Sequence, residues 1–427
     1  MNQIELTREG VVLSKRFFAY GNKNINIGIQ IDKRVRKTTE RWKFSNRIAS
    51  HVVIMNLLVC SDKSRLYYSR DKKRMLPKQY NRYKLTNFKI AKAMDELESY
   101  GMVENNIAQR QYGSVTDKQA SYAVVTDLFI KTFSKRSTLI SDAVDVYVSS
   151  FNPIELRDKD KHPIEFETNE LIEEAKRVVS GINALNLTHK ITDYNGDSIV
   201  CMYTRVFNNS SFDIGGRWFK ATILAIKNKL TNNRLRTKID DKQVVEIDFD
   251  CLHIAMLSDM LGITKYRGID IYYHVLDKKD YTANNRRLVK LAINIMLNAT
   301  SLQKATQAIN DEMRGGKYCY KNASEVIAAV HKALPEFVQK FCTKECTGLV
   351  LQNKDSWIAH YVVDEFLKVN KPVLIIHDSF IAIKEDAQFL SDCMTMAYKK
   401  VMQVDRVVHM KMNWLEDGLP QSVDCSK

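Results

Sequence analysis

Two aspartates in the C-terminal half of the chain stand where a carboxylate is well placed to bind a metal ion. The β-branched segment 244–250 is typical of a strand and ends in the carboxylates Asp248 and Asp250, and Asp378 interrupts the apolar segment 372–383. The second pattern predicts a β-hairpin with His377 and Asp378 at its turn. An acid at a strand end is held rigidly at the rim of a sheet, within reach of a metal ion or substrate. For Asp248 the alternative is a cap on the following helix, whereas a buried hairpin has little structural need for an acid at its tip.

A polar stripe on the predicted helix 285–298 supplies matching positive charge. Its polar residues recur at every fourth position: Arg286, Lys290, Asn294 and Asn298. The other faces are mostly apolar, so the helix is expected to be packed on several sides. An ordinary solvent-facing stripe is the alternative, but it would normally carry acids as well, and this one has none. Two cations one helical turn apart suit a triphosphate.

A glycine pair precedes a further candidate, Arg217. Gly215 and Gly216 permit a tight backbone turn, which presents Arg217 beside the aromatic residues Trp218 and Phe219. By itself this motif indicates no particular chemistry.

The composition predicts a large, helix-rich globular protein that carries these residues on packed elements. The chain has 427 residues, 45% of them hydrophobic and 27% charged, with only 15 Gly and 6 Pro. This length accommodates two or three domains, and the composition excludes disordered and collagen-like classes. No stretch reaches the roughly 18 uninterrupted apolar residues of a membrane span, and the eight Cys are scattered. We therefore expect a soluble, cytoplasmic protein with reduced thiols and no membrane partner.

Positive charge is concentrated in residues 1–100. They carry 22 Lys and Arg against 9 Asp and Glu, a net charge of +13 out of +15 for the whole chain. Cations alternate with tyrosines between residues 63 and 92, and such surfaces neutralise phosphates while the rings stack on bases or sugars. A solvated basic face is the alternative. The expected template contacts in this region are Lys72, Lys73, Arg74 and Lys89.

The elements of the basic region follow the order of a winged helix-turn-helix domain. Apolar spacing predicts helices at 44–60 and 83–100, the second with Thr86 as its N-cap. Strands are predicted at 103–109 and 120–127. The second helix would read DNA and the hairpin would be the wing, although a purely structural helix and hairpin pair gives the same pattern.

A second, larger domain is expected to begin after residue 150. The segment 149–167 combines a charged run with two of the six prolines, which is typical of a linker or boundary. The expected domains therefore span residues 1–150 and 151–427. An apolar stripe over 169–183 predicts the first helix of the larger one.

In order and spacing, these segments resemble the polymerase core shared by the single-subunit RNA polymerases of bacteriophages and mitochondria and the family A DNA polymerases. Motif A of that core ends a palm strand with a metal-binding acid, matched here by Asp248. Motif B is a helix of pattern R-x-x-x-K, matched by Arg286 and Lys290. Motif C is His-Asp on a palm hairpin, matched by His377 and Asp378.

The resemblance implies an α+β, right-hand fold of palm, fingers and thumb. The implied thumb is about 168–210, the palm about 211–261 and 369–427, and the fingers about 262–368. Asp248 and Asp378 would hold two Mg²⁺ or Mn²⁺ ions, and the partners would be nucleoside triphosphates and a DNA template. Arg217 lies in a stretch similar to the family's D-x-x-G-R-x-aromatic motif and would lie along the template or hybrid.

Departures from the family pattern concern nucleotide recognition. Motif B usually closes with an aromatic residue and a Tyr-Gly pair, whereas Asn294, Asn298 and Ala299 stand here. His253 occupies the position near the ribose where the DNA polymerases have Glu and the RNA polymerases have Gly. Its imidazole would either fill the 2′ space or hydrogen-bond to a 2′-hydroxyl. With His377, these residues form the expected nucleotide-binding set: His253, Asn294, Asn298 and His377.

The preferred function is a template-directed nucleic-acid polymerase, slightly favoured as a DNA-dependent RNA polymerase or primer-synthesising enzyme. A phage or mobile element acting in a bacterial cytoplasm is the expected setting. The alternatives are a family A-like DNA polymerase, an untemplated terminal transferase, and a DNA-binding replication or transcription factor with an inactive polymerase-like domain. The two acids and the R-x-x-x-K pair weigh against an inactive domain, and the missing motif B aromatics weigh for it.

Overall fold

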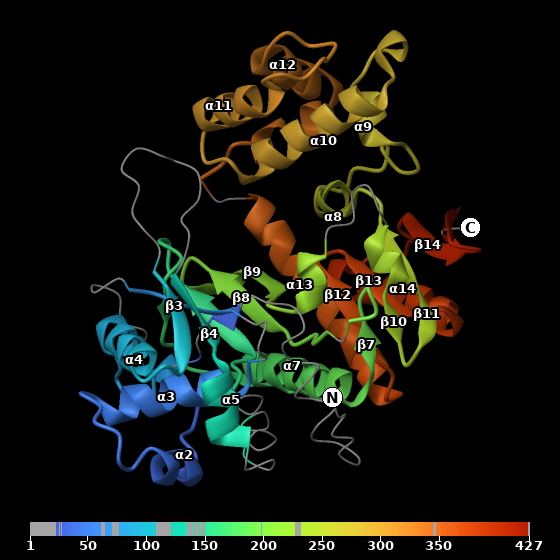
Figure 1. The fold of residues 1–427 in the computed structure, drawn as a ribbon. Helices are drawn as coiled ribbons and strands as arrows, with labels where there is room; N and C mark the ends of the chain where they lie inside the picture. Colours follow the sequence, from blue (N-terminus) through green and yellow to red (C-terminus); the bar gives the residue numbers. More distant parts are fainter. Residues whose placement is uncertain are drawn as a thin grey trace. The chain divides into compact units, whose positions relative to one another are not determined.

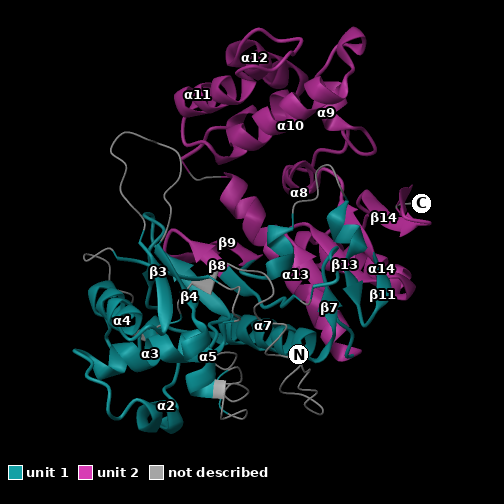
Figure 2. Cartoon of the chain, viewed as in Figure 1, with its two compact units in different colours: residues 1–205, 219–244, 370–372 teal, residues 206–218, 245–369, 373–427 magenta. Residues whose placement is uncertain are grey.

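The computed structural model shows an α+β chain that divides into two compact units, coloured separately in Figure 2. Unit 1 comprises residues 1–205, 219–244 and 370–372, and unit 2 comprises residues 206–218, 245–369 and 373–427. The residues described are 23–24, 26, 28–60, 65–70, 77–107, 121–134, 139, 143, 146, 150–197, 199–226, 232–344 and 347–425. None of the helices built from them combines the length and apolar character that crossing a membrane requires.

Unit 1 combines helices with short strands (Figure 1). Its helices are α2 (Lys33–Thr38), α3 (Arg47–Leu58), α4 (Asn87–Ser99), α5 (Asp127–Ser134) and α7 (Glu170–Thr188). Its strands are β1 (Lys23–Asn24), β2 (Leu66–Tyr68), β3 (Val103–Asn106), β4 (Ser121–Val125), β5 (Ile154–Arg157), β6 (Pro163–Ile164), β7 (Ile191–Thr192) and β10 (Lys238–Ile239). The first four strands form a sheet in the order β1-β2-β4-β3.

The helices and strands predicted for the basic region are confirmed. The side chain of Asn46 caps α3, and Thr86 caps α4 by accepting a hydrogen bond from Lys89 N at 3.3 Å. Helix α4 ends before Gly101, whose φ of +70° suits glycine. Their bounds are shorter than predicted by a few residues, and Asp127, predicted to end the strand at 120–127, begins α5 instead.

The core of unit 1 extends beyond the basic region. Apolar residues of α3, α4, α5 and the four-stranded sheet form one buried cluster, which also includes Val200 and Met202. The segment predicted as a linker, 149–167, contains the antiparallel pair β5 and β6. Unit 1 thus continues past residue 150 to Arg205.

Unit 2 contains the segments that carry the candidate chemistry. Its helices are α8 (Leu252–Met260), α9 (Ile271–His274), α10 (Ala283–Asn298), α11 (Leu302–Met313), α12 (Ala323–Ala333), α13 (Thr347–Lys368) and α14 (Ala387–Met402). Strands β12 (Leu374–Ile376), β13 (Ser379–Ile383), β14 (Met410–Glu416) and β15 (Leu419–Asp424) lie wholly within it. Strands β8 (Thr204–Asn208), β9 (Ser211–Phe219) and β11 (Lys242–Phe249) run across the unit boundaries.

The predicted strand, helix and hairpin of unit 2 are confirmed, and the register shows how they meet. Strands β12 and β13 form an antiparallel hairpin in which Ile376 pairs with Ser379, so His377 and Asp378 make a two-residue turn. His377 has a φ of +60°, a left-handed conformation that histidine adopts more readily than most residues. Strand β14 pairs antiparallel with Val245–Phe249 of β11 and with β15. Helix α13 packs against α8, α10 and α14.

Candidate active site

The turn that carries Asp378 lies beside the end of the strand that carries Asp248. The main-chain N–H of Phe249 donates a hydrogen bond to the carbonyl oxygen of Asp378 at 3.3 Å. The hydroxyl of Ser379 donates to Oε1 of the buried Glu246 at 2.7 Å. These two bonds tie β13 to β11, so two acids from distant parts of the sequence meet at one end of the sheet.

The surroundings of Asp248 disfavour its ionised form. Burial and the negative charges of Asp378 and Glu246 raise the pKa of Asp248 to about 8, while Lys290 opposes this shift. Asp248 and Asp378 are both half-buried, and neither forms an ion pair with a Lys or Arg that the structure describes. Carboxylate oxygens are hard ligands that suit Mg²⁺ or Mn²⁺. The donor set therefore fits a divalent cation, whose charge would offset the repulsion between the acids.

Lys290 and Arg286 lie on α10, one helical turn apart, but their surroundings differ. Lys290 is exposed, and its positive charge acts on Asp248. Arg286 donates from Nε to Oδ2 of Asp270 at 2.7 Å, and its guanidinium lies over the ring of Tyr272, 5.1 Å from the centroid. Asp270 also caps α9 through Oδ1. Arg286 is thus held by an acid, whereas Lys290 is the cation whose charge acts on Asp248.

Asn294 and Asn298 continue this stripe toward the end of α10. Asn298 donates from Nδ2 to the carbonyl oxygen of Asn294 at 2.8 Å. Its side chain also fills the space over Gly348 of α13, where any larger residue would collide with it. Asn298 therefore has a packing role between two helices, and nucleotide binding by either asparagine stays a prediction.

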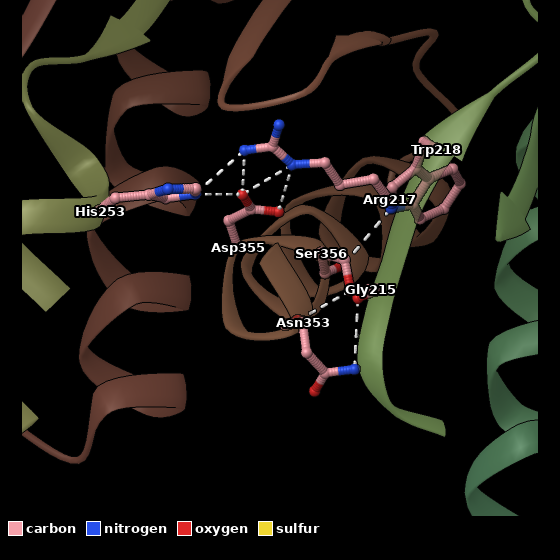
Figure 3. Close-up of polar contacts among 7 residues, drawn as sticks. All are labelled: Gly215, Arg217, Trp218, His253, Asn353, Asp355 and Ser356. Atoms are coloured by element: carbon pink, nitrogen blue, oxygen red, sulfur yellow. Dashed lines mark hydrogen bonds and ion pairs between the residues drawn. The ribbon is translucent and has the colours of Figure 1, made fainter. Parts of the chain in front are cut away.

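Arg217 and His253 meet at a residue that the sequence analysis did not select, Asp355 of α13 (Figure 3). Arg217 Nε donates to Oδ2 of Asp355 at 2.9 Å, and Arg217 Nη2 also pairs with this oxygen. His253 Nε2 lies 2.9 Å from the same Oδ2 and 3.0 Å from Arg217 Nη2. The side chain of Asp355 is 1% exposed, against 19% for Arg217 and 16% for His253. The three side chains form a largely buried polar cluster.

The glycine pair before Arg217 makes this cluster possible. Gly215 and Gly216 have φ values of +77° and +89°, and a Cβ on Gly216 would lie 2.7 Å from both Phe207 Cε1 and Ser356 Oγ. Trp218 Nε1 donates to the carbonyl oxygen of Ser356 at 3.4 Å (Figure 3). The missing side chains thus let β9 lie directly against α13, one residue from Asp355.

Sequence reasoning missed two residues that pair with predicted site residues. Asp355 could have been found from the sequence. It stands one turn after the buried Leu351 on the apolar stripe of its helix, and an acid at such a buried position needs a partner. Lys411 of β14 could not have been found in this way, because only the strand register shows that it lies directly opposite Asp248 on β11. Cross-strand partners share one face of a sheet, so this register adds a second cation on the face of Asp248.

Asp250, the second aspartate of the segment 244–250, follows Asp248 by two residues. It is exposed, and its main-chain N–H donates to the carbonyl oxygen of His409 at 2.9 Å. A cavity of about 110 Å³ opens beside it, with Arg267, Arg406 and His409 among its lining residues. Neither Asp248 nor Asp378 lines this cavity.

The expected template contacts of the basic region lie in unit 1 or outside the described residues. Lys89 is exposed in the first turn of α4, and Lys92 is exposed one turn later. Lys72, Lys73 and Arg74 lie outside the described residues.

One group of possible metal ligands lies elsewhere, at the exposed β5–β6 turn: Asp158, Asp160 and His162. Oδ1 of Asp158 accepts hydrogen bonds from the main-chain N–H groups of Asp160 and His162, at 2.9 and 2.8 Å. This carboxylate closes the turn, which explains the grouping without an ion.

No family model matches the chain, and no curated protein matches it either. Among solved structures, it is similar to the POL domain of Pol1 from M. smegmatis, in complex with DNA primer-template and dNTP. The sequence identity is 11% and the TM-score is 0.37, over 90% of this chain and 66% of that one. The chain thus spans just under two thirds of that structure, and a likeness this low assigns no function.

Proposed function

We propose that the chain is a Mg²⁺- or Mn²⁺-dependent, template-directed nucleotidyltransferase that polymerises nucleotides on a DNA template. In this proposal the thumb is about 168–210, the palm about 211–261 and 369–427, and the fingers about 262–368. The first domain, 1–150, binds DNA as a winged helix. Ribonucleotides are slightly favoured as substrates, in a phage or mobile element.

The observation that carries the proposal is the meeting of Asp248 and Asp378 at one end of the sheet, where the charge of Lys290 acts on Asp248. Asp248 lies near the end of β11 and Asp378 lies in the β12–β13 turn, and the hydrogen bond from Phe249 N to the carbonyl oxygen of Asp378 links the two segments. Burial, and then the negative charge of Asp378, raises the pKa of Asp248, while the charge of Lys290 lowers it. Two acids and an exposed cation are groups that suit phosphoryl transfer, because positioning and charge neutralisation do most of the work.

A bound pair of Mg²⁺ ions would supply Lewis-acid stabilisation of the charge that develops on the reacting phosphate. Asp248 and Asp378 would hold these ions. Lys290 would neutralise the triphosphate and the departing pyrophosphate, and its freedom from ion pairs with the described acids leaves its charge available. Arg286, held by Asp270, is the more rigid of the two cations and is suited to orienting the triphosphate.

Recognition of the sugar is assigned to His253. Its Nε2 is bonded within the cluster with Asp355 and Arg217, so the ring has a defined orientation. A ring with a fixed orientation distinguishes NTPs from dNTPs better than a mobile ring. A dNTP lacks the 2′-hydroxyl, so it leaves a buried polar atom of the fixed ring without a hydrogen-bond partner.

The proposal is tested by nucleotide incorporation with defined templates. Full-length protein is incubated with labelled NTPs or dNTPs, Mg²⁺ or Mn²⁺, and single-stranded or duplex DNA with and without a primer. Asp248→Asn and Asp378→Asn should each abolish incorporation while the circular dichroism spectrum stays unchanged. Asp392→Asn, which alters an exposed acid of α14, is the matched control and should retain activity. Incorporation by either site variant would refute the assignment.

A second candidate is a DNA-binding replication or transcription factor with an inactive polymerase-like domain. It is favoured by Asn294 and Asn298, which stand where aromatic stacking on the nascent base pair is expected. The same assay separates the two candidates, since this one predicts DNA binding by the parent protein without incorporation of any nucleotide. Incorporation of dNTPs alone would identify a DNA polymerase, and incorporation without a template would identify a terminal transferase.

A further inference from the structure

Asp355 is a buried carboxylate at which three elements of unit 2 meet. It lies on α13 and pairs with Arg217 of β9 and His253 of α8 (Figure 3). Arg217 uses both Nε and Nη2 in this pairing, with Nε 2.9 Å from Oδ2. Its Nη1 makes no hydrogen bond to any residue that the structure describes. Nε and Nη2 of the guanidinium are therefore bonded to Asp355, and Nη1 is available to donate to another acceptor.

The guanidinium also lies within electrostatic reach of Asp378. Arg217 contacts His253 of α8, four residues after Phe249 at the end of β11, and the N–H of Phe249 is bonded to the carbonyl oxygen of Asp378. Burial lowers the pKa of Arg217, but the negative charges of Asp355 and then Asp378 raise it above its ordinary value. Arg217 thus lies among two acids, and the geometry shows it bonded to only one of them.

Whether Arg217 pairs with Asp355 or with Asp378 affects how well Asp378 can bind a metal ion. An arginine paired with Asp378 would occupy carboxylate lone pairs and cancel the charge that attracts a divalent cation. Asp355 offers the better partner, because it is almost fully buried, accepts from two guanidinium nitrogens and is bonded to His253 as well. Its own negative charge also offsets the repulsion that Arg217 would exert on an incoming cation.

We propose that Asp355 is a positioning residue that holds Arg217 away from Asp378 and so leaves Asp378 available for a divalent cation. The inference rests on the proposed function, since it takes Asp248 and Asp378 as metal ligands. It assigns to Asp355 the role of an internal counter-ion, acting on the metal site through Arg217.

Mn²⁺ binding to the full-length protein, followed by the electron paramagnetic resonance signal of free Mn²⁺, tests the inference without any reaction. Asp355→Asn should weaken Mn²⁺ binding roughly tenfold, because Arg217 becomes an uncompensated cation beside Asp378. Adding Arg217→Met to that variant should restore the affinity to within about twofold of the parent. Asp355→Glu, which keeps the charge, should bind Mn²⁺ nearly as the parent does.

The outcomes separate this inference from the proposed function. Unchanged Mn²⁺ affinity in a folded Asp355→Asn variant, or no recovery in the double variant, would show that Asp355 is only structural, and nucleotide incorporation by the parent would be unaffected. A parent that binds no Mn²⁺, or binds it equally well with Asp378→Asn, would overturn both. If Asp355→Asn does not fold, Arg217→Met alone decides: it should bind Mn²⁺ at least as tightly as the parent, and weaker binding overturns the proposal.

Discussion

Phe249 and Asp378 are joined by a main-chain hydrogen bond of 3.3 Å, from the N–H of Phe249 to the carbonyl oxygen of Asp378. This bond places the turn of the β12–β13 hairpin beside the residue that follows Asp248. Because it involves only main-chain atoms, it holds the two carboxylates at one end of the sheet whatever their protonation or metal occupancy. The turn should therefore keep its place beside β11 in variants that alter only the acidic side chains.

Lys290→Ala should lower kcat for nucleotide incorporation strongly, with a smaller effect on KM. Its charge is most useful as pyrophosphate departs, and a transition-state interaction of this kind contributes about 2–4 kcal/mol. Arg287→Ala is the matched control, because Arg287 is an exposed cation on the same helix. Steady-state kinetics measure both variants, and equal losses would show that α10 contributes only general charge.

His253→Ala should reduce a preference for NTPs over dNTPs. If the imidazole hydrogen-bonds to the 2′-hydroxyl, its loss costs about 1–3 kcal/mol of discrimination. Competition between matched NTP and dNTP substrates measures the ratio of kcat/KM. A parent that prefers dNTPs, with the preference relaxed in His253→Ala, would instead show that the ring fills the 2′ space and would favour DNA synthesis. An unchanged ratio would remove His253 from the site.

Asp248→Asn should stabilise the metal-free protein increasingly as pH rises. A carboxyl whose folded-state pKa is raised, here to about 8, contributes stability that is present below its unfolded value and lost as pH rises through the folded value. Asparagine does not ionise. In EDTA, the Tm of the variant minus the Tm of the parent should therefore increase between about pH 5 and pH 8. Calorimetry measures this difference, and one that is constant with pH contradicts it.

At about pH 8, added Mg²⁺ should make the parent more stable than the Asp248→Asn variant. A cation bound by the ionised acids stabilises the folded state, so added Mg²⁺ should raise the Tm of the parent. The Asp248→Asn variant should respond much less, because one ligand is missing. Equal responses would place the stabilising ion elsewhere, for example at the turn that contains Asp158.

Gly216→Ala should destabilise the protein by about 3 kcal/mol or more, because it combines left-handed backbone strain with a side-chain collision. Its φ is +89°, and the new Cβ would lie 2.7 Å from Phe207 Cε1 and Ser356 Oγ. Gly262→Ala is the control, with a φ of +67° and no atom within 4 Å, and should cost only about 1 kcal/mol of backbone strain. Urea unfolding measures both. Similar losses would mean that close packing of β9 on α13 does not require the glycine.

Removing the exposed cations of α4 should weaken DNA binding and flatten its salt dependence. Lys89→Ala combined with Lys92→Ala should lower the log–log salt slope by about one unit for each phosphate that the variant no longer neutralises. Lys131→Ala, an exposed cation on α5, is the control. Substitution is preferable to deleting residues 1–150, because Val200 and Met202 pack in the same core. Fluorescence anisotropy with labelled duplex DNA measures the slopes, and an unchanged slope in the double variant would exclude α4 from the DNA-binding surface.

The sequence by itself determined the local elements and the residues exposed at their ends. Period-two and helical patterns were enough for β11, α10 and the β12–β13 hairpin, because hydrophobic periodicity and turn residues act over a few neighbours. They also singled out Asp248, Asp378 and Lys290, whose polarity contrasts with the apolar segments around them.

Only the tertiary structure decided which side chains meet. Arg217 and His253 were each expected to face a ligand, yet Arg217 is bonded to Asp355, 138 residues away in the chain. Such pairings depend on how closely β9, α8 and α13 pack, which glycines such as Gly216 permit and no local pattern encodes. A buried ion pair such as this one depends on packing that brings opposite charges together away from water. The whole fold therefore determines which residues are its partners.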